Sequence, residues 1–251
     1  MSWFDSFALF LGSLISNTMA SLSGGGAGLL QFPLLIFMGL PFSIALATHK
    51  LASVALGLGA TVTHLKRGGL SYSFITYLVL VGSIGVILGA HLVLLVPGDI
   101  AEKGLGITIL ALGIYSRFKK QLGQSDEPMR RDVLGMTIGA IVLILIGIIN
   151  GSIAAGSGLL VTIFLVRWFG CSYKQAIALT MISVGLFWNG IGAVAITIAG
   201  ADIYWPWLPI LLAGSFIGGS LGAYLMKRLS NNSIKIAFEI LTFAVGIKLL
   251  F

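Results

Sequence analysis

Ser21-Leu-Ser-Gly-Gly-Gly-Ala-Gly28 and Asn150-Gly-Ser-Ile-Ala-Ala-Gly-Ser-Gly158 are two glycine-rich breaks in an otherwise apolar sequence. Each break is followed by a short apolar segment, 27–39 and 157–169, and a helix of about 13 residues reaches only roughly 20 Å. A helix that crosses the hydrocarbon core of a bilayer needs about 20 residues. The two segments are therefore too short to span a membrane unaided.

The composition indicates a membrane protein. Hydrophobic residues make up 57% of the 251 positions and charged residues only 9%, whereas a soluble domain has about 25% charged residues. Splitting the apolar runs at polar, glycine and proline positions gives ten segments, which are 4–22, 27–39, 43–63, 72–96, 103–118, 133–151, 157–169, 173–198, 205–227 and 233–251. We therefore expect an all-α, polytopic protein of the plasma or inner membrane, with the lipid bilayer as its surroundings.

Several other classes of protein do not fit the sequence. The single cysteine, Cys171, argues against a disulfide framework and a thiolate metal site, and we expect no metal or cofactor. The formal net charge of +7 is scattered between apolar runs, so we interpret it as a topology signal and not as a nucleic-acid surface. The sequence contains neither an HExxH motif nor paired carboxylates within a span, which are patterns typical of active sites. We therefore predict that the protein is not an enzyme.

The two halves of the chain are weakly repeated. An offset of 130 residues aligns the two breaks, and an offset of 133 aligns glycines further on; the pairs are Gly26 with Gly156, Gly28 with Gly158, Gly85 with Gly218 and Gly89 with Gly222. Five segments per half is an odd number, so the second half must enter the membrane upside down. We predict an N-terminal repeat over 1–120, a connector over 121–132 and a C-terminal inverted repeat over 133–251.

The basic residues support this topology. Nearly all of them fall in alternate loops, which lie on one side of the membrane; these are Lys66, Arg67, Arg117, Lys119, Lys120, Arg130, Arg131, Arg167, Lys174, Lys227, Arg228 and Lys235. By the positive-inside rule the connector is cytoplasmic and both termini face the outside. A re-entrant hairpin would remove two crossings and leave this parity unchanged, so both eight and ten crossings fit the charges.

The two breaks are the leading candidates for a binding site. Interrupted helices at matching places of inverted repeats are typical of secondary transporters, and the N-terminus of a short helix in mid-membrane favours an anion. We predict that the substrate-binding residues in the breaks are Gly25, Gly26, Gly28, Gly156, Ser157 and Gly158. The alternative is that these glycines only allow helices to pack closely, because small residues four apart do so elsewhere.

Two ionisable residues lie together inside an apolar segment, His49 and Lys50. A charge near the bilayer centre costs at least roughly 2.5 to 3.5 kcal/mol, so Lys50 is a candidate for holding the charge of an anion; alternatively, its ammonium reaches the lipid headgroups. His49 either carries a proton that travels with the substrate or is a buried, hydrogen-bonded side chain. Polar residues that would offer neutral hydrogen bonds to a solute or between helices are Thr180 and Asn189, with Asn17, Gln31, Asn150 and Ser183.

These motifs resemble a known family. Gly24-Gly-Gly-Ala-Gly28, followed by Pro33, Gly39, Pro41, Ala45, Ala47-Thr48 and Lys50, is similar to the N-terminal repeat of the sulfite exporter TauE/SafE family, and Gly156-Ser-Gly-Leu159 with Ala176-Ile-Ala-Leu-Thr180 is similar to its C-terminal repeat. The resemblance covers almost the whole chain. It implies a multi-pass plasma-membrane transporter of small sulfur-containing anions such as sulfite or organosulfonates. His49 departs from the family pattern, in which a small polar residue is more usual.

We therefore expect a secondary transporter of a small anionic solute that works by alternating access and is coupled to an ion or proton gradient. A homodimer is one assembly that we consider. Two alternatives remain open from the sequence. One is a passive anion channel, which would lack alternating access. The other is a membrane assembly protein without transport activity.

Overall fold

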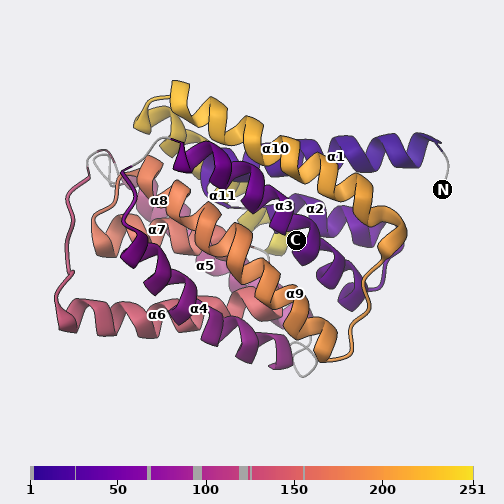
Figure 1. Ribbon diagram of the computed structural model, residues 1–251, viewed down its shortest axis with the longest axis horizontal. Coiled ribbons are helices and arrows are strands. Elements are labelled where there is room, and N and C mark those ends of the chain that lie inside the picture. The colour runs from indigo at the N-terminus through magenta and orange to yellow at the C-terminus, as the bar shows by residue number, and fades with distance from the viewer. Residues whose placement is uncertain are drawn as a thin grey trace.

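The computed structural model of the chain describes residues 3–25, 27–66, 69–92, 98–118, 124, 126–154 and 156–250. Within these ranges every regular element is a helix, which confirms the predicted fold class. In chain order the elements are α1 (Trp3–Ser23), α2 (Ala27–Phe37), α3 (Phe42–Leu65), α4 (Tyr72–Leu92), α5 (Gly98–Phe118), α6 (Val133–Ser152), α7 (Ser157–Phe169), α8 (Tyr173–Thr180), η1 (Met181–Trp188), α9 (Asn189–Ile198), η2 (Trp205–Trp207), α10 (Leu208–Arg228) and α11 (Asn231–Leu250) (Figure 1).

Each of the ten predicted segments corresponds to one helix or to one continuous helical run. Among the described residues, six stretches are long and apolar enough to cross a membrane, namely Asp5–Ser23, Phe42–Leu65, Tyr72–Leu92, Val133–Ser152, Tyr173–Ile198 and Trp205–Arg228. The protein is thus a multi-pass membrane protein. α2 and α7 have only 11 and 13 residues, as expected for the short segments. α5 and α11 have 21 and 20 residues, and the total number of crossings stays a prediction.

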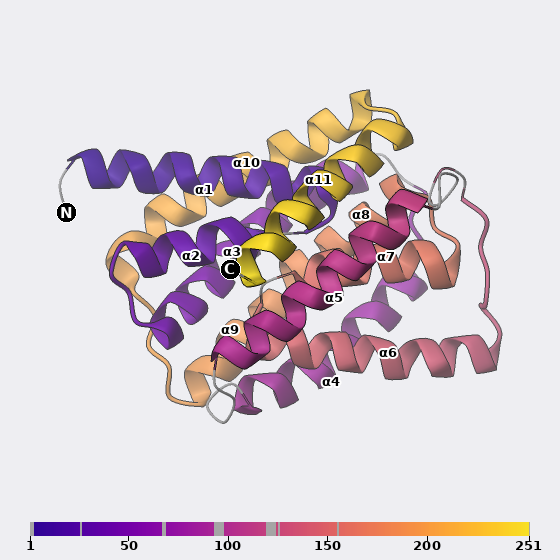
Figure 2. The ribbon, with the colours of Figure 1, turned by 180° about the vertical axis from the view of Figure 1, so that it is seen from behind.

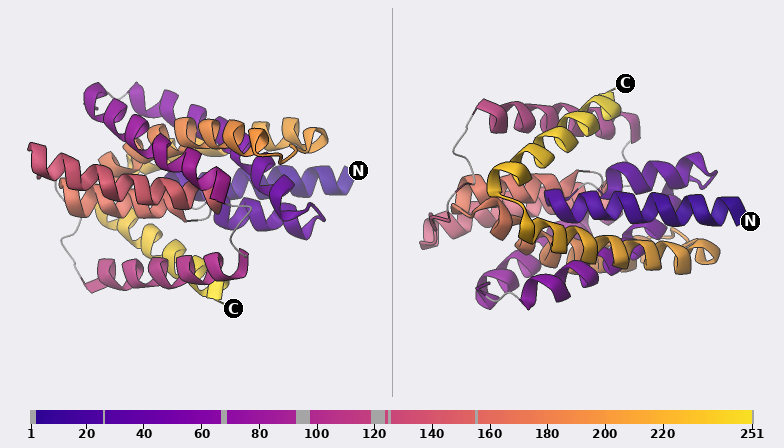
Figure 3. Two further views of the ribbon diagram at one scale, coloured as in Figure 1. Left: turned by 90° about the horizontal axis from the view of Figure 1, so that it is seen from below. Right: turned by 90° about the horizontal axis from the view of Figure 1, so that it is seen from above.

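The helices of the two halves are interleaved. α1 packs along α10, and α6 packs along α4, so the first helix of each half lies against the fourth segment of the other half (Figures 1 and 2). α5 and α11 pack on each other and stand together on one side of the bundle (Figure 3). This exchange of partners is what a two-fold relation between the halves predicts. The inversion itself and the division at 121–132 stay predictions.

Among the glycines that let the interleaved pairs approach closely are the four that the offset of 133 residues aligns. A Cβ added to any of them would collide with a backbone oxygen of the facing helix. The colliding pairs are Gly85 with Ile144, Gly89 with Ile148, Gly218 with Leu14 and Gly222 with Thr18. These glycines therefore serve helix packing, as small residues commonly do in membranes.

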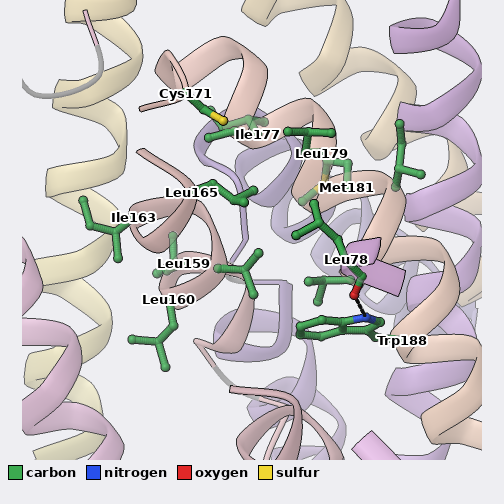
Figure 4. Close-up of a cluster of buried hydrophobic side chains, with 14 of the residues drawn as sticks. Leu78, Leu159, Leu160, Ile163, Leu165, Cys171, Ile177, Leu179, Met181 and Trp188 are labelled. Atoms are coloured by element: carbon green, nitrogen blue, oxygen red, sulfur yellow. Dashed lines mark hydrogen bonds between the residues drawn. The ribbon is translucent and has the colours of Figure 1, made fainter. Parts of the chain in front are cut away.

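One hydrophobic core surrounds α7, α8 and η1, where buried leucine, isoleucine and methionine side chains pack together (Figure 4). Trp188 is fully buried there, and its indole Nε1 donates a hydrogen bond of 3.1 Å to the carbonyl oxygen of Leu78 in α4. Its ring packs against Gly82, where a Cβ would not fit. A tryptophan in the middle of a span is thus accommodated because its polar group is satisfied and a glycine leaves room for its ring.

Candidate functional site

The two glycine breaks meet inside the bundle. A Cβ added to Gly25 would lie 2.6 Å from the carbonyl carbon of Gly158, so the two backbones are in direct contact. The hydroxyl of Thr162 in α7 donates a hydrogen bond of 2.7 Å to the carbonyl oxygen of Gly24. The two glycine breaks, which are far apart in the sequence, are therefore in direct contact in the folded protein.

The breaks arise from backbone conformations that favour glycine. Gly24 and Gly25 have φ angles of +87° and +146°, and Gly156 has a φ of +75°. Because L-residues with a side chain disfavour positive φ, glycine is the residue that most readily ends one helix there and starts the next. α2 then begins at Ala27 and α7 at Ser157.

A small cavity of about 30 Å³ lies at this meeting point. Its walls include the first residues of α2 and α7, the side chains of His49 and Ser53 from α3, Asn150 from α6 and Asn189 from α9, and part of η1. The cavity has room for water, and a solute of several atoms enters only if the surrounding helices move apart. The π-helical η1 in its wall is a rare conformation that is often found at functional sites.

Lys50 lies next to this cavity and is fully buried. Its Nζ donates hydrogen bonds to the backbone oxygen of Asn150 at 2.6 Å and to the Oδ1 of the same residue at 3.3 Å. The ammonium therefore does not reach the lipid headgroups. Lys50 is not itself among the lining residues, and it contacts the cavity through Asn150. Among the described residues no carboxylate forms a salt bridge with Lys50.

Asn150 connects four helices at the site. Its Nδ2 donates to the hydroxyl of Ser157 at 2.8 Å and to the Oδ1 of Asn189 at 3.5 Å. Ser157 in turn donates to the carbonyl oxygen of Ala154 at 2.9 Å. From the sequence, Asn150 was only one of several polar candidates, and nothing but its place at the second break would have distinguished it.

His49 is held by a second hydrogen-bond network. Its Nδ1 lies 2.9 Å from the Oε1 of Gln31 in α2, and its Nε2 lies 3.3 Å from the hydroxyl of Ser53. The Nε2 of Gln31 donates to the hydroxyl of Ser13 in α1 at 2.9 Å and to that of Ser215 in α10 at 3.2 Å. Gln31 therefore supports His49 rather than facing the cavity.

The predicted site residues are distributed as follows. Those that line the cavity are Gly25, Gly28, His49, Ser157, Gly158 and Asn189. Gly156 is the N-cap of α7, and the hydroxyl of Thr180 lies 3.0 Å from that of Thr162, within hydrogen-bond distance, without lining the cavity. Gly26 lies outside the described residues. Their roles in binding stay predictions.

The chemistry of the site suits an anion. The described lining residues include no carboxylate, while the first turns of α2 and α7 present N–H groups and a partial positive charge. The buried amino group of Lys50 lies nearby and adds a positive charge when it is protonated. Among the described residues there is no group of three His, Cys, Asp or Glu side chains that would hold a metal ion.

Comparisons with known proteins identify the family of this chain. The sequence profile described as Sulfite exporter TauE/SafE matches residues 8–249. A "Probable membrane transporter protein" of Haemophilus influenzae is 27% identical, with 97% of this chain and 93% of that protein covered. The "Probable membrane transporter protein YfcA" of Escherichia coli is 26% identical over 97% and 88% of the two chains, and YtnM of Bacillus subtilis, with the same description, is 27% identical over 87% and 73%.

No solved structure matches the chain. The profile match extends over nearly all of the helices described above, including both glycine breaks. The chain therefore belongs to the sulfite exporter TauE/SafE family, whose relatives named here carry the description of membrane transporters.

Proposed function

We propose that this protein is a secondary transporter that moves a small sulfur oxyanion, either sulfite or an organosulfonate, across the plasma membrane. The observation that carries the proposal is the cavity between two broken helices, beside a buried lysine without a carboxylate partner among the described residues. The family description and the names of the relatives support the same function.

The oxygen atoms of such an anion need hydrogen-bond donors, and the site offers several. In this proposal the N–H groups at the starts of α2 and α7 donate to the anion, together with the amide group of Asn189. The hydroxyl of Ser157 joins them by exchanging its hydrogen bond to the Ala154 carbonyl for one to the anion. Lys50 supplies the net positive charge. Because the site is buried in a medium of low dielectric, one uncompensated charge strongly favours an anion over a neutral solute or a cation.

The cavity volume of about 30 Å³ limits the size of the substrate that fits before the helices move. Alanine and glycine form much of the wall, including Ala20, Ala27 and Gly185. A Cβ added to Gly57 in α3 would lie 2.6 Å from the Cα of Leu186, so α3 and η1 are in backbone contact beside the cavity. We propose that α3 and η1 separate during transport, which would open the cavity to one side at a time.

A passive channel is the second candidate, but the small volume of the cavity favours a carrier. The two functions are separated by flux measurements on purified protein in liposomes. We expect saturable uptake of labelled sulfite or sulfoacetate, accelerated by unlabelled anion on the opposite side. Uptake that rises linearly with concentration and is not accelerated in this way would indicate a channel. If neither sulfite, sulfate, thiosulfate, taurine nor sulfoacetate binds or moves, the proposal is wrong.

A further inference from the structure

His49 is the one titratable side chain among the described residues that line the cavity. It is buried, with 2% of its surface exposed. Both nitrogens of its ring are hydrogen-bonded, Nδ1 with Gln31 and Nε2 with Ser53. This arrangement determines where its proton lies.

The surrounding network fixes the orientation of the Gln31 amide. Ser13 donates its own hydroxyl proton to the carbonyl oxygen of Leu211 at 3.0 Å, so its oxygen accepts from the Nε2 of Gln31. The other end of the amide, Oε1, then faces the Nδ1 of His49 at 2.9 Å. An amide oxygen only accepts hydrogen bonds, so Nδ1 carries the ring proton.

The other ring nitrogen is therefore the one that can gain a proton. Nε2 of the neutral ring is an acceptor, and it lies 3.3 Å from the hydroxyl of Ser53, which also lines the cavity. A proton added at Nε2 would create a second N–H donor on the cavity side, while Nδ1 keeps its hydrogen bond to Gln31.

The charges around the ring determine when this happens. The charged neighbour on its own helix is Lys50, and the groups from the other elements are all neutral: Gln31 of α2, Asn150 of α6, Asn189 of α9, and Ser13 and Ser215 behind Gln31. Two adjacent positive charges repel each other in the empty site. A singly charged anion is balanced by Lys50 alone, whereas a doubly charged anion leaves one negative charge unbalanced at low dielectric.

We propose that His49 takes up one proton at Nε2 when a doubly charged oxyanion occupies the cavity, and that Gln31 is the positioning residue that directs the proton to that nitrogen. The inference rests on the proposed function and names the proton as the coupling ion for such substrates. The proton comes from water on the open side of the membrane, an N–H bond forms at Nε2, and no bond of the anion breaks. The proton leaves again with the anion.

Thermodynamic linkage makes the proposal measurable, because a proton that favours the anion is favoured equally by it. Calorimetric titration in two buffers of different ionisation enthalpy gives the number of protons bound per anion. Sulfate and methanesulfonate are suitable probes, since near neutral pH they carry two charges and one charge and do not titrate. We expect about one proton per sulfate and none per methanesulfonate. Sulfate affinity should rise by up to about tenfold per unit decrease in pH.

Two variants and one control test the residues. His49→Asn should remove the proton uptake, and Gln31→Met should reduce it and flatten the pH profile of sulfate binding, because a thioether does not hold the proton at Nδ1. His64→Asn is the matched control, since His64 is a buried histidine of the same helix that does not line the cavity. Its proton uptake should equal that of the wild type.

The outcomes separate this inference from the proposed function. Sulfate binding without proton uptake, or uptake that persists in His49→Asn, would overturn the inference and leave an anion transporter. If neither probe binds at any concentration tested, and neither does sulfite or sulfoacetate, the proposed function fails and the inference fails with it.

Discussion

The Nζ of Lys50 donates a 2.6 Å hydrogen bond to the backbone oxygen of Asn150. Asn150 lies in the last turn of α6, where unpaired carbonyl groups carry a partial negative charge. The same carbonyl also accepts from the backbone N–H of Ala154 at 3.1 Å. The Lys50 side chain from the first half of the chain is thus held at the second glycine break, and Asn150 connects it to the cavity.

Replacing Lys50 with methionine should remove the charge that attracts the anion while keeping most of the side-chain volume. We expect Lys50→Met to weaken the binding of sulfite or sulfoacetate by at least about tenfold, which is about 1.4 kcal/mol. The melting temperature should not fall, because a buried charge without a carboxylate partner is removed. Lys66→Met, at the exposed end of the same helix, is the control. Unchanged affinity in Lys50→Met would show that Lys50 is structural.

Asn150→Asp tests the same charge with almost no change in shape. A carboxylate at this position would lie within reach of the Lys50 ammonium, since Oδ1 is already 3.3 Å from Nζ. The resulting ion pair should cancel the net positive charge and lower anion affinity by at least about tenfold, while folding is retained. Binding and thermal melting of the purified variant measure both effects. Affinity equal to that of the wild type would contradict the role of net charge.

Gly25→Ala should disrupt the contact between the two breaks. The added Cβ would lie 2.6 Å from the backbone of Gly158, and Gly25 also has a positive φ. Gly39 has a φ of +97° but nothing within 4 Å of an added Cβ, so Gly39→Ala isolates the cost of the backbone conformation, about 1–2 kcal/mol. We expect Gly25→Ala to lose more stability than Gly39→Ala and to lose anion binding as well. Equal losses in the two variants would show that close approach at the breaks is unimportant.

Cys171 should be inert to thiol reagents in the folded protein. Only 1% of its surface is exposed, and burial raises the pKa of its thiol to about 12. At neutral pH the thiol is therefore protonated, and the reactive thiolate forms only as the pH approaches that value. A maleimide should label the protein at pH 7 only after denaturation. Rapid labelling of the native protein would show that the loop before α8 opens.

An inert native cysteine permits a test of the predicted topology. Asp202 and Ser230 are exposed and lie on loops that the charge pattern assigns to opposite sides of the membrane. A membrane-impermeant maleimide should label Asp202→Cys in intact cells, and it should label Ser230→Cys only after the membrane is opened. The reverse pattern would mean that both termini are cytoplasmic.

Much of the architecture was predictable from local features. The ends of the ten helical segments agree with the apolar runs to within a few residues at most boundaries, and the two short helices follow the two glycine breaks. These properties depend on the length of an apolar run and on the backbone freedom of glycine, which neighbouring residues alone determine. The contact between the breaks, at Gly25 and Gly158, is what the predicted repeat leads one to expect, because related elements of inverted repeats meet at a common site.

The hydrogen-bond partner of each polar side chain was not predictable from these local sequence features. In the predicted repeat an offset of 131 residues aligns Thr180 with His49, yet His49 lines the cavity and Thr180 bonds to Thr162 outside it.

The sequence by itself therefore determined that this is a helical membrane protein, where its helices begin and break, and which family it belongs to. Only the tertiary structure decided that Lys50 binds the end of α6, and that Gln31 orients His49. The physical reason is that these contacts depend on how each helix is rotated about its axis and which helix packs beside it, and both are set by the packing of the whole bundle.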